Sequence, residues 1–335
     1  MGNARPGTGD ASGRRIVAAQ AGRIDAVLAA AYPDLSRSRV QRLIAEGHAR
    51  LNGESARKAA SVMPGDTIEI DVVQHPHELP QAPQSALPIL YEDEALLAID
   101  KPAGLAVHGA PGDTAPSVAG WMLARLGPLA DEFDADHPGV VHRLDKDTTG
   151  VLLLAKTPIA QSALSAAFEA RTVEKTYLAV TDGVPNRARA IIDAPIARHP
   201  GDRTRMAVTR NGRASRTRYE VLGEDHGRAL LVLHPETGRT HQIRVHLAAI
   251  HCPVLFDRTY GGPQSAVDDQ QSTIPPRRQL LHAWRISIPH PNGGTLEVIA
   301  PLAPDFAEHI RSTALEPLAS EYMEGRAPMR EQASK

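Results

Sequence analysis

Apolar and polar residues near the start of the chain follow the periods of two helices and a hairpin. Residues 24–31 carry apolar side chains at i, i+3, i+4 and i+7, which predicts an amphipathic helix. A second apolar stripe lies between Ser36, a natural N-cap, and Gly47, a typical helix stop, and predicts a second helix. The Asn-Gly turn at 51–54 and the alternating residues 67–70 predict a hairpin and a strand.

Further along, short apolar runs outnumber helical patterns. The runs at 96–99, 230–233 and 295–299 are too short for free-standing helices and predict buried strands. Helical spacing is found at 118–126 and 160–170, and a turn at 236–240 leads into a further predicted helix at 241–250. Many strands with helices at irregular intervals predict an α+β domain, built on a mixed, largely antiparallel sheet with flanking helices.

The patterning divides the chain into two domains with connecting segments. Residues 72–88 contain four prolines among polar residues, which is typical of a semi-rigid, extended linker. The predicted layout is a disordered leader at 1–21, a small α/β domain at 22–72, a Pro-rich linker at 73–88, the larger domain at 89–316 and a flexible tail at 317–335.

Composition narrows the class of protein. Hydrophobic residues make up 42% of the 335 residues, which is enough for ordinary cores. Cys252 is the only cysteine, so an internal disulfide and a Cys-based zinc site are excluded, which fits a reducing cytoplasm. No apolar run approaches the ~20 residues that cross a bilayer, so we expect a cytoplasmic protein without a membrane partner.

Charge is distributed unevenly, although the net charge is only −2. Seven arginines, among them Arg203 and Arg205, lie between Arg198 and Arg218 with a single acid, Asp202. Such a strip steers anions toward it, although a solvated loop has the same composition. The strip is predicted to form a loop or a hairpin around Asn211-Gly212.

Polar residues gather at 142–150, His-Arg-Leu-Asp-Lys-Asp-Thr-Thr-Gly, between apolar runs at 139–141 and 151–155 that predict buried strands. A Gly-ended polar turn between core elements presents its side chains at the surface. Asp145, flanked by cations, can stay ionised there and face a ligand. Taken alone, an Asp in a turn is most often a cap or an ion-pair partner, and Asp147 is a weaker candidate of the same kind.

The stretch 142–150 resembles the catalytic motif of the RluA-type pseudouridine synthases, and the resemblance extends over roughly residues 22–310. Three stretches favour the RluD branch of that family over its relatives: 145–149, 198–200 with 205–208, and 236–239. The resemblance implies a pseudouridine synthase sheet with the active-site cleft across it. Residues 101–104, Lys-Pro-Ala-Gly, resemble an element expected to pack beneath the active-site loop.

The resemblance also implies catalytic roles. Asp145 matches the catalytic carboxylate, Arg244 the arginine that pairs with it, and Tyr177 the tyrosine that lies against the target base. A cation beside an Asp lowers its pKa by about 1–3 units and keeps it charged. Without the resemblance, Tyr177 is an ordinary strand aromatic and Arg244 a phosphate contact or a surface ion pair.

The implied reaction breaks the bond from uridine N1 to C1′ and rejoins C1′ to C5. Substrate and product are isomers, so we expect neither a cofactor nor a metal, in keeping with the absence of Walker and Rossmann glycine patterns. The base must leave its stack, which costs a few kcal/mol. We expect Arg143 to enter the vacated space or to pin the neighbouring phosphate.

The first domain resembles the S4 RNA-binding domain, whose second helix offers basic side chains to RNA phosphates. A solvated helix face is the alternative reading of its charges. The expected RNA contacts are Arg37, Arg39 and Arg42 on that helix, with Arg143, Arg203, Arg205, Arg239 and His241 in the second domain.

The resemblance implies 23S ribosomal RNA in the helix 69 region, or the assembling 50S subunit, as partner of a monomeric enzyme. One alternative is a pseudouridine synthase for other ribosomal or transfer RNA uridines. An alternative of another class is a non-catalytic RNA-binding ribosome-assembly factor, which needs the basic surfaces but not Asp145. A carbohydrate glycosidase is disfavoured because no second carboxylate can be nominated as the general acid, and hydrolysis by water does not explain the basic helices.

Overall fold

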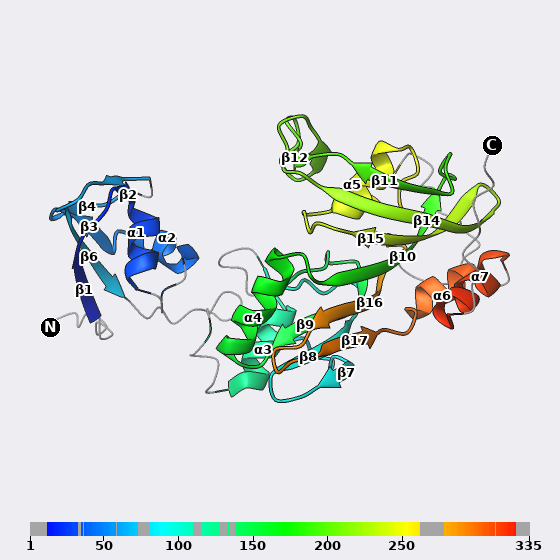
Figure 1. The fold of residues 1–335 in the computed structure, drawn as a ribbon, viewed down its shortest axis with the longest axis horizontal. Helices are drawn as coiled ribbons and strands as arrows, with labels where there is room; N and C mark the ends of the chain where they lie inside the picture. The colour runs from blue at the N-terminus through cyan, green and yellow to red at the C-terminus, as the bar shows by residue number, and fades with distance from the viewer. Residues whose placement is uncertain are drawn as a thin grey trace, which may run out of the picture. The chain divides into compact units, whose positions relative to one another are not determined.

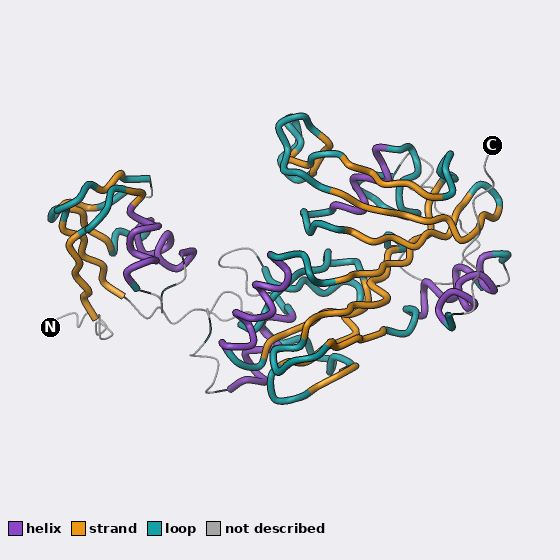
Figure 2. The backbone as a smooth tube through the Cα atoms, viewed as in Figure 1, coloured by secondary structure: helices purple, strands orange, loops and turns teal. Residues whose placement is uncertain are grey.

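The computed structural model describes residues 12–32, 35, 37–57, 59–72, 81–109, 115–127, 133, 138–261, 278–311 and 313–325 (Figures 1 and 2). The chain forms two compact units. The first comprises Met1–Leu79 with Asp134–Asp136, and the second Pro80–Phe133 with His137–Lys335. None of the helices in the described residues is long and apolar enough to cross a lipid bilayer.

The first unit packs two helices against a small sheet. Its elements are β1 (Ser12–Val17), β2 (Gly22–Arg23), α1 (Ile24–Ala31), α2 (Arg37–Ala45), β3 (Ala49–Leu51), β4 (Glu54–Ser55), β5 (Ser61–Val62) and β6 (Thr67–Val72). The apolar stripes of both helices form one core with β6, in which Leu28, Val40 and Ile68 are fully buried. The Asn52-Gly53 turn joins β3 to β4 with both residues at positive φ, as predicted.

The expected leader at 1–21 is wrong for residues 12–17. They form β1, which pairs antiparallel along β6 with Ile16 opposite Ile68. The pairing satisfies one edge of β6 in the order β1-β6-β3-β4, and Ile16 packs against the core. Residues 1–11 lie outside the described part.

The second unit is built on a nine-stranded sheet in the order β11-β14-β15-β10-β16-β9-β8-β7, with β17 beside β16 (Figure 1). The strands are β7 (Ile89–Glu92), β8 (Leu96–Lys101), β9 (Thr149–Ala155), β10 (Glu174–Asp182), β11 (Arg189–Asp193), β14 (Arg216–Asp225), β15 (Arg228–Pro235), β16 (Leu281–Pro289) and β17 (Thr295–Ile299). Every pair is antiparallel except β9 with β16, which is parallel. The mixed, largely antiparallel α+β fold is as predicted.

Helices cover both faces of this sheet, which explains its continuous apolar runs. They are α3 (Val118–Leu126), α4 (Pro158–Glu169), α5 (Gln242–Ala249), α6 (Pro304–Ile310) and α7 (Leu315–Met323). Alternate residues of β9 feed two cores, one with α3 and one with α4, so the whole strand is buried. Alternate residues of β15 likewise pack against α5 on one face and against α6 and α7 on the other.

The flexible tail predicted at 317–335 is wrong for its first part, because α7 continues to Met323. Leu315 and Ala319 are buried against the sheet, and this apolar contact orders the helix. Residues 326–335 lie outside the described part. The predicted linker at 73–88 also ends earlier than expected, since Leu87 joins the α3 core, while 73–80 lie outside the described residues.

Two local predictions need correction near the site. The run at 139–141 forms no strand; only Val140 makes an isolated bridge, to Leu154. The arginine strip does fold as a hairpin, of β12 (Ile196–Arg198) with β13 (Met206–Val208). Its reversal lies at 199–205 rather than at the Asn-Gly pair, because Ile196 and Arg213 exchange backbone hydrogen bonds that place 211–212 in the next turn.

Candidate active site

The polar turn at 142–148 lies at the entrance to β9, in the middle of the larger sheet. Gly150 has a φ of 107°, and a β-carbon there would collide with the carbonyl oxygen of Ala283 on β16. Glycine is therefore required for β9 to approach β16 this closely. The parallel contact brings the turn next to residues that arrive from distant parts of the chain.

A buried lysine holds the turn from beneath. The Lys101 ammonium donates to the carbonyl oxygens of Pro102 at 2.7 Å, Leu105 at 2.9 Å and Lys146 at 2.9 Å. Its side chain is fully buried, and burial lowers the pKa of Lys101 to about 7. The Lys-Pro-Ala-Gly element thus packs under the active-site loop, as expected from the sequence.

Asp145 leaves this turn toward α5 and meets Arg244. Arg244 Nη1 donates to Asp145 Oδ2 at 3.0 Å, and the two side chains are 6% and 16% exposed. The Asp145 carboxylate therefore has an almost fully buried cationic partner on one side. Its other side faces a cavity, which is described below. Asp147, the weaker candidate, is absent from the residues that line this cavity.

A second carboxylate aims the arginine. Asp257 is fully buried and accepts from Arg244 Nε at 2.6 Å and Nη2 at 2.9 Å, a bidentate contact that leaves Nη1 for Asp145. The backbone N–H groups of Thr259 and Tyr260 donate to Asp257 Oδ1. Burial alone would lower the pKa of Arg244, but Asp257 and Asp145 outweigh it and raise that pKa.

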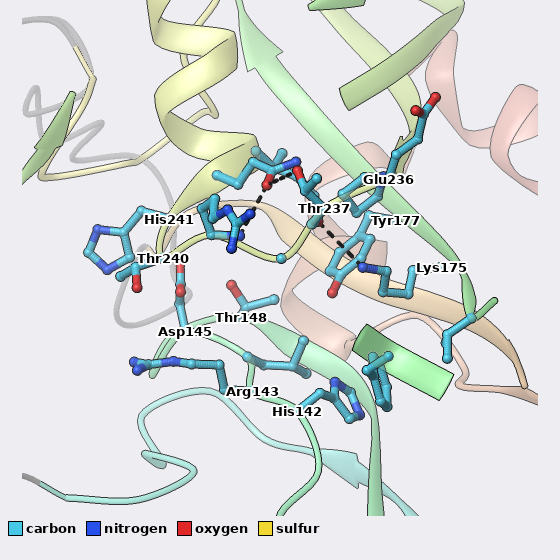
Figure 3. Close-up of a pocket in the computed structure, with 18 of the residues that line it drawn as sticks. His142, Arg143, Asp145, Thr148, Lys175, Tyr177, Glu236, Thr237, Thr240 and His241 are labelled. Carbon is cyan, nitrogen blue, oxygen red and sulfur yellow. Dashed lines mark hydrogen bonds between the residues drawn. The ribbon is translucent and has the colours of Figure 1, made fainter. Parts of the chain in front are cut away.

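A cavity of about 440 Å³ opens beside Asp145, lined by the turn, β10, the loop after β15 and the start of α5 (Figure 3). This volume suits one small ligand rather than a nucleic-acid helix. Tyr177 projects into it from β10, its ring packed between the α3 and α5 cores. Burial, and then the charge of Asp145, raise the pKa of Tyr177, so its phenol is neutral.

The loop after β15 is held by one side-chain amide. Gln242 Oε1 accepts from the Thr237 hydroxyl at 2.6 Å and from Arg239 N–H at 3.1 Å. Its Nε2 donates to Arg216 O at 2.9 Å and to Thr217 Oγ1 at 3.0 Å. The cavity wall at 235–241 is therefore rigidly connected to β14.

His241 precedes α5 with a left-handed φ of 56°, so the helix begins one residue later than the predicted start. Its Nδ1 lies 2.8 Å from the Tyr260 hydroxyl, which also accepts from Met206 N–H at 2.9 Å. Arg205 and Arg244 lie over the Tyr260 ring, 5.3 and 5.1 Å from its centroid. Tyr260 thus connects the β12–β13 hairpin of the arginine strip to Arg244.

The structure brings together most of the residues expected at the site. Asp145, Tyr177, Arg244, Arg143, Arg239 and His241 all line the cavity. Arg205 reaches it only through Tyr260, and Arg203 is exposed in the hairpin turn, outside the lining. Arg37, Arg39 and Arg42 lie on α2, but their side chains are outside the described part of the structure.

Sequence reasoning missed Lys175, Gln242, Asp257 and Tyr260. Gln242 lies two residues before Arg244 in the sequence, and Lys175 is a cation in a strand two residues before Tyr177. Either position offered a signal. Nothing in the local sequence around Asp257 or Tyr260 points to Arg244, because those contacts exist only in the folded chain.

Comparison with known proteins places this site in a family. The profile of the family described as RNA pseudouridylate synthase matches residues 95–249, and that of the S4 domain matches 22–68. A ribosomal large subunit pseudouridine synthase D of Xanthomonas campestris is 41% identical over 292 residues, covering 85% of this chain and 86% of that protein. The chain belongs to the RNA pseudouridine synthase family. The prediction of an isomerase with an N-terminal S4 domain is confirmed.

Other members of the RNA pseudouridine synthase family show the same likeness. An uncharacterized RNA pseudouridine synthase of Aquifex aeolicus is 39% identical over 275 residues, covering 81% of this chain and 87% of that one. The solved structure of human RNA pseudouridylate synthase domain containing 4 is 29% identical with a TM-score of 0.52. The match covers 67% of the present chain and 91% of the human chain.

Proposed function

We propose that this RNA pseudouridine synthase isomerises specific uridines of large-subunit ribosomal RNA, in the helix 69 region, and uses Asp145 as its catalytic carboxylate. The observation that carries the proposal is the Arg244–Asp145 contact of 3.0 Å at the wall of a nucleotide-sized cavity. The name of the relative from Xanthomonas campestris supports the choice of large-subunit RNA.

The chemistry follows from the geometry of the cavity. An extruded uridine enters with its ring against Tyr177 and its sugar toward Asp145. Asp145, paired with Arg244, attacks the sugar or the ring so that the bond from N1 to C1′ breaks. The raised pKa of Tyr177 favours a stacking and hydrogen-bonding role for its neutral phenol over a role as a phenolate base. Rotation of the base then presents C5 to C1′.

Basic residues around the cavity suit the flanking RNA. Arg143 is exposed at the cavity and is proposed to occupy the gap left by the extruded base. Arg239, His241, Arg203 and Arg205 are proposed to contact neighbouring phosphates. Residues 22–72 would add an RNA grip through α2, and residues 89–316 would carry catalysis. The enzyme is proposed to act as a cytoplasmic monomer.

Two experiments test this function. Pseudouridine mapping across ribosomal RNA from cells that lack the protein should reveal lost modifications in the helix 69 region. Purified wild type should restore them, and Asp145→Asn should bind the RNA with unchanged affinity but form no pseudouridine. Asp147→Asn, in the same turn, serves as the matched control and should remain active.

The outcomes separate the alternatives. Losses elsewhere in ribosomal or transfer RNA would replace the proposed substrate but keep the reaction. A fully active Asp145→Asn variant would remove the catalytic assignment. Unchanged pseudouridine in the deletion strain, together with a defect in subunit assembly, would favour the non-catalytic assembly factor.

A further inference from the structure

Lys175 is a half-buried cation in the cavity wall that the proposed chemistry does not yet use. It stands on β10 two residues before Tyr177, so both side chains project from the same face of the sheet into the cavity (Figure 3). Its ammonium makes one long hydrogen bond, to Thr237 O at 3.4 Å. Among the described residues, no carboxylate oxygen lies within 4.0 Å of the Lys175 ammonium, the limit for an ion pair.

Lys101 and Lys175 differ in how many hydrogen-bond acceptors surround their ammonium groups. The Lys101 ammonium has three carbonyl acceptors at 2.7–2.9 Å and so uses all of its N–H groups inside the protein. Lys175 has the same three donors but, among the residues that the structure describes, only the one distant acceptor. Burial lowers the pKa of Lys175 to about 8, which records the cost of keeping this charge away from water. A partly desolvated cation facing a cavity calls for an acceptor on the ligand.

The isomerisation supplies such an acceptor whichever atom Asp145 attacks. If Asp145 takes C1′, the electron pair of the C1′–N1 bond passes to the uracil and spreads over N1, O2 and O4. If it adds to C6, the electrons pass through C5 to O4. In both cases negative charge develops on a carbonyl oxygen of the base. It is discharged when C5 bonds to C1′, the bond to Asp145 breaks with its electron pair returning to the carboxylate, and C5 releases its proton while N1 gains one.

We propose that the Lys175 ammonium donates a hydrogen bond to a carbonyl oxygen of the extruded uracil and stabilises the negative charge that develops there during the glycosidic exchange. The inference rests on the proposed function, because it needs a uracil in the cavity. Tyr177 then supports the plane of the ring, Lys175 its oxygen edge, and the Asp145–Arg244 pair its sugar. A donor aimed at developing charge in a dry site contributes about 10²–10³-fold in rate.

Two other roles are possible for such a residue and make different predictions. A lysine that binds a phosphate adds to affinity and to its salt dependence, about 0.7–0.9 in the log–log slope for each contact. A lysine that merely clasps Thr237 stabilises the fold. A lysine in the proposed role instead accelerates the chemical step. Its charge is partly desolvated in the folded protein, so replacing it by a neutral residue removes that desolvation cost.

The test uses Lys175→Met and Lys175→Arg in the full chain, with Lys156→Met as the control. Lys156 is also a partly buried lysine, but it pairs with Glu92 at 2.8 Å, and neither residue lines the cavity. Single-turnover pseudouridine formation should slow about 10²–10³-fold in Lys175→Met. It should recover partly in Lys175→Arg and stay unchanged in the control. The affinity of Lys175→Met for the RNA should stay within about twofold of the wild-type affinity. The slope of log affinity against log salt concentration should stay within about 0.3 of the wild-type slope, on the order of experimental error.

Three further readouts exclude a structural effect. The melting temperature of Lys175→Met should be no lower than that of wild type. The wild-type kcat/KM should fall above about pH 8, and this limb should vanish in Lys175→Met. The other ionisable groups lining the cavity are the arginines and Asp145, Glu169, Glu236, His142, His241 and Tyr177, of classes that do not ordinarily titrate near pH 8. The defect should also shrink on RNA carrying 2-thiouridine or 4-thiouridine at the target, since sulfur is a weaker acceptor.

Clear results would overturn the inference. A Lys175→Met variant with the wild-type single-turnover rate refutes it, and so does a loss confined to affinity and salt slope, which would assign a phosphate contact. A lower melting temperature with Lys175→Gln restoring full rate would assign a structural clasp. An equal defect on both thio-substituted RNAs would also reject the carbonyl contact. Failure of the proposed function is distinguishable, because wild type itself would then form no pseudouridine.

Discussion

Replacing Asp257 by Asn should damage both folding and catalysis through Arg244. The substitution keeps the shape of the side chain but removes its charge and turns one of its two acceptors into a donor. Asp257 accepts four hydrogen bonds, two of them from an arginine that is only 6% exposed. Breaking a buried ion pair by removing one partner costs about 3–5 kcal/mol, because the remaining charge stays buried.

The stability loss should be moderated by Asp145, which still faces Arg244 Nη1. We therefore expect the unfolding free energy of Asp257→Asn to fall by about 3 kcal/mol, at the lower end of that range. The expected rate loss is about 10²-fold, because a displacement near 1 Å of a positioning group has that effect. Urea denaturation measures the first quantity, and single-turnover pseudouridine formation on the RNA measures the second.

A matched control separates burial from charge. Asp193→Asn removes another carboxylate beside an arginine, Arg216 at 3.3 Å, but there the side chains are 65% and 44% exposed. Its effect should stay below about 1 kcal/mol, with full activity. The double variant Asp257→Asn with Arg244→Met should regain part of the stability of the single variant while remaining inactive. If Asp257→Asn lost less than about 1 kcal/mol and kept its rate, the argument that Asp257 positions Arg244 would be wrong.

Two further predictions concern the platform under the turn. Gly150→Ala should lower the unfolding free energy by about 1–3 kcal/mol or more, since its φ of 107° and the Ala283 carbonyl both oppose a β-carbon; an unchanged urea midpoint would contradict this. Because the pKa of Lys101 is about 7 when folded and near 10.5 when unfolded, the unfolded chain binds the extra proton between these values. The unfolding free energy of wild type should therefore rise with pH across that window relative to Lys101→Met, and parallel pH curves for the two proteins would disprove the linkage.

Local patterns were enough to predict most of the elements. The apolar spacing at 118–126 and the short run at 295–299 are the bounds of α3 and β17 in the structure. Periods of 3.6 and 2 are readable because the residues that make them are neighbours in the sequence. β1 could not be predicted in this way because it has no apolar alternation of its own. It forms by pairing with β6, some fifty residues later in the chain.

The candidate site divides in the same way. Asp145, Tyr177 and Arg244 were found through motif resemblance, and the fold then brought Asp145 and Arg244 together across 99 residues of sequence. Asp257 could not be found because an Asp followed by Arg, Thr and Tyr has no local signature of an arginine anchor. Lys175 could not be singled out because a strand lysine usually projects into bulk water, and only the folded chain places this one half-buried in a cavity wall.

The parallel contact between β9 and β16 has a mechanical consequence. That ladder comprises only two residue pairs, His282 with Thr149 and Ala283 with Gly150, whereas β8 and β9 share six. The sheet therefore has a seam, with the Asp145 turn attached to one flank and Arg244 to the other. The contact of Arg244 with Asp145 therefore adds a buried ion pair across a junction that has few backbone hydrogen bonds of its own.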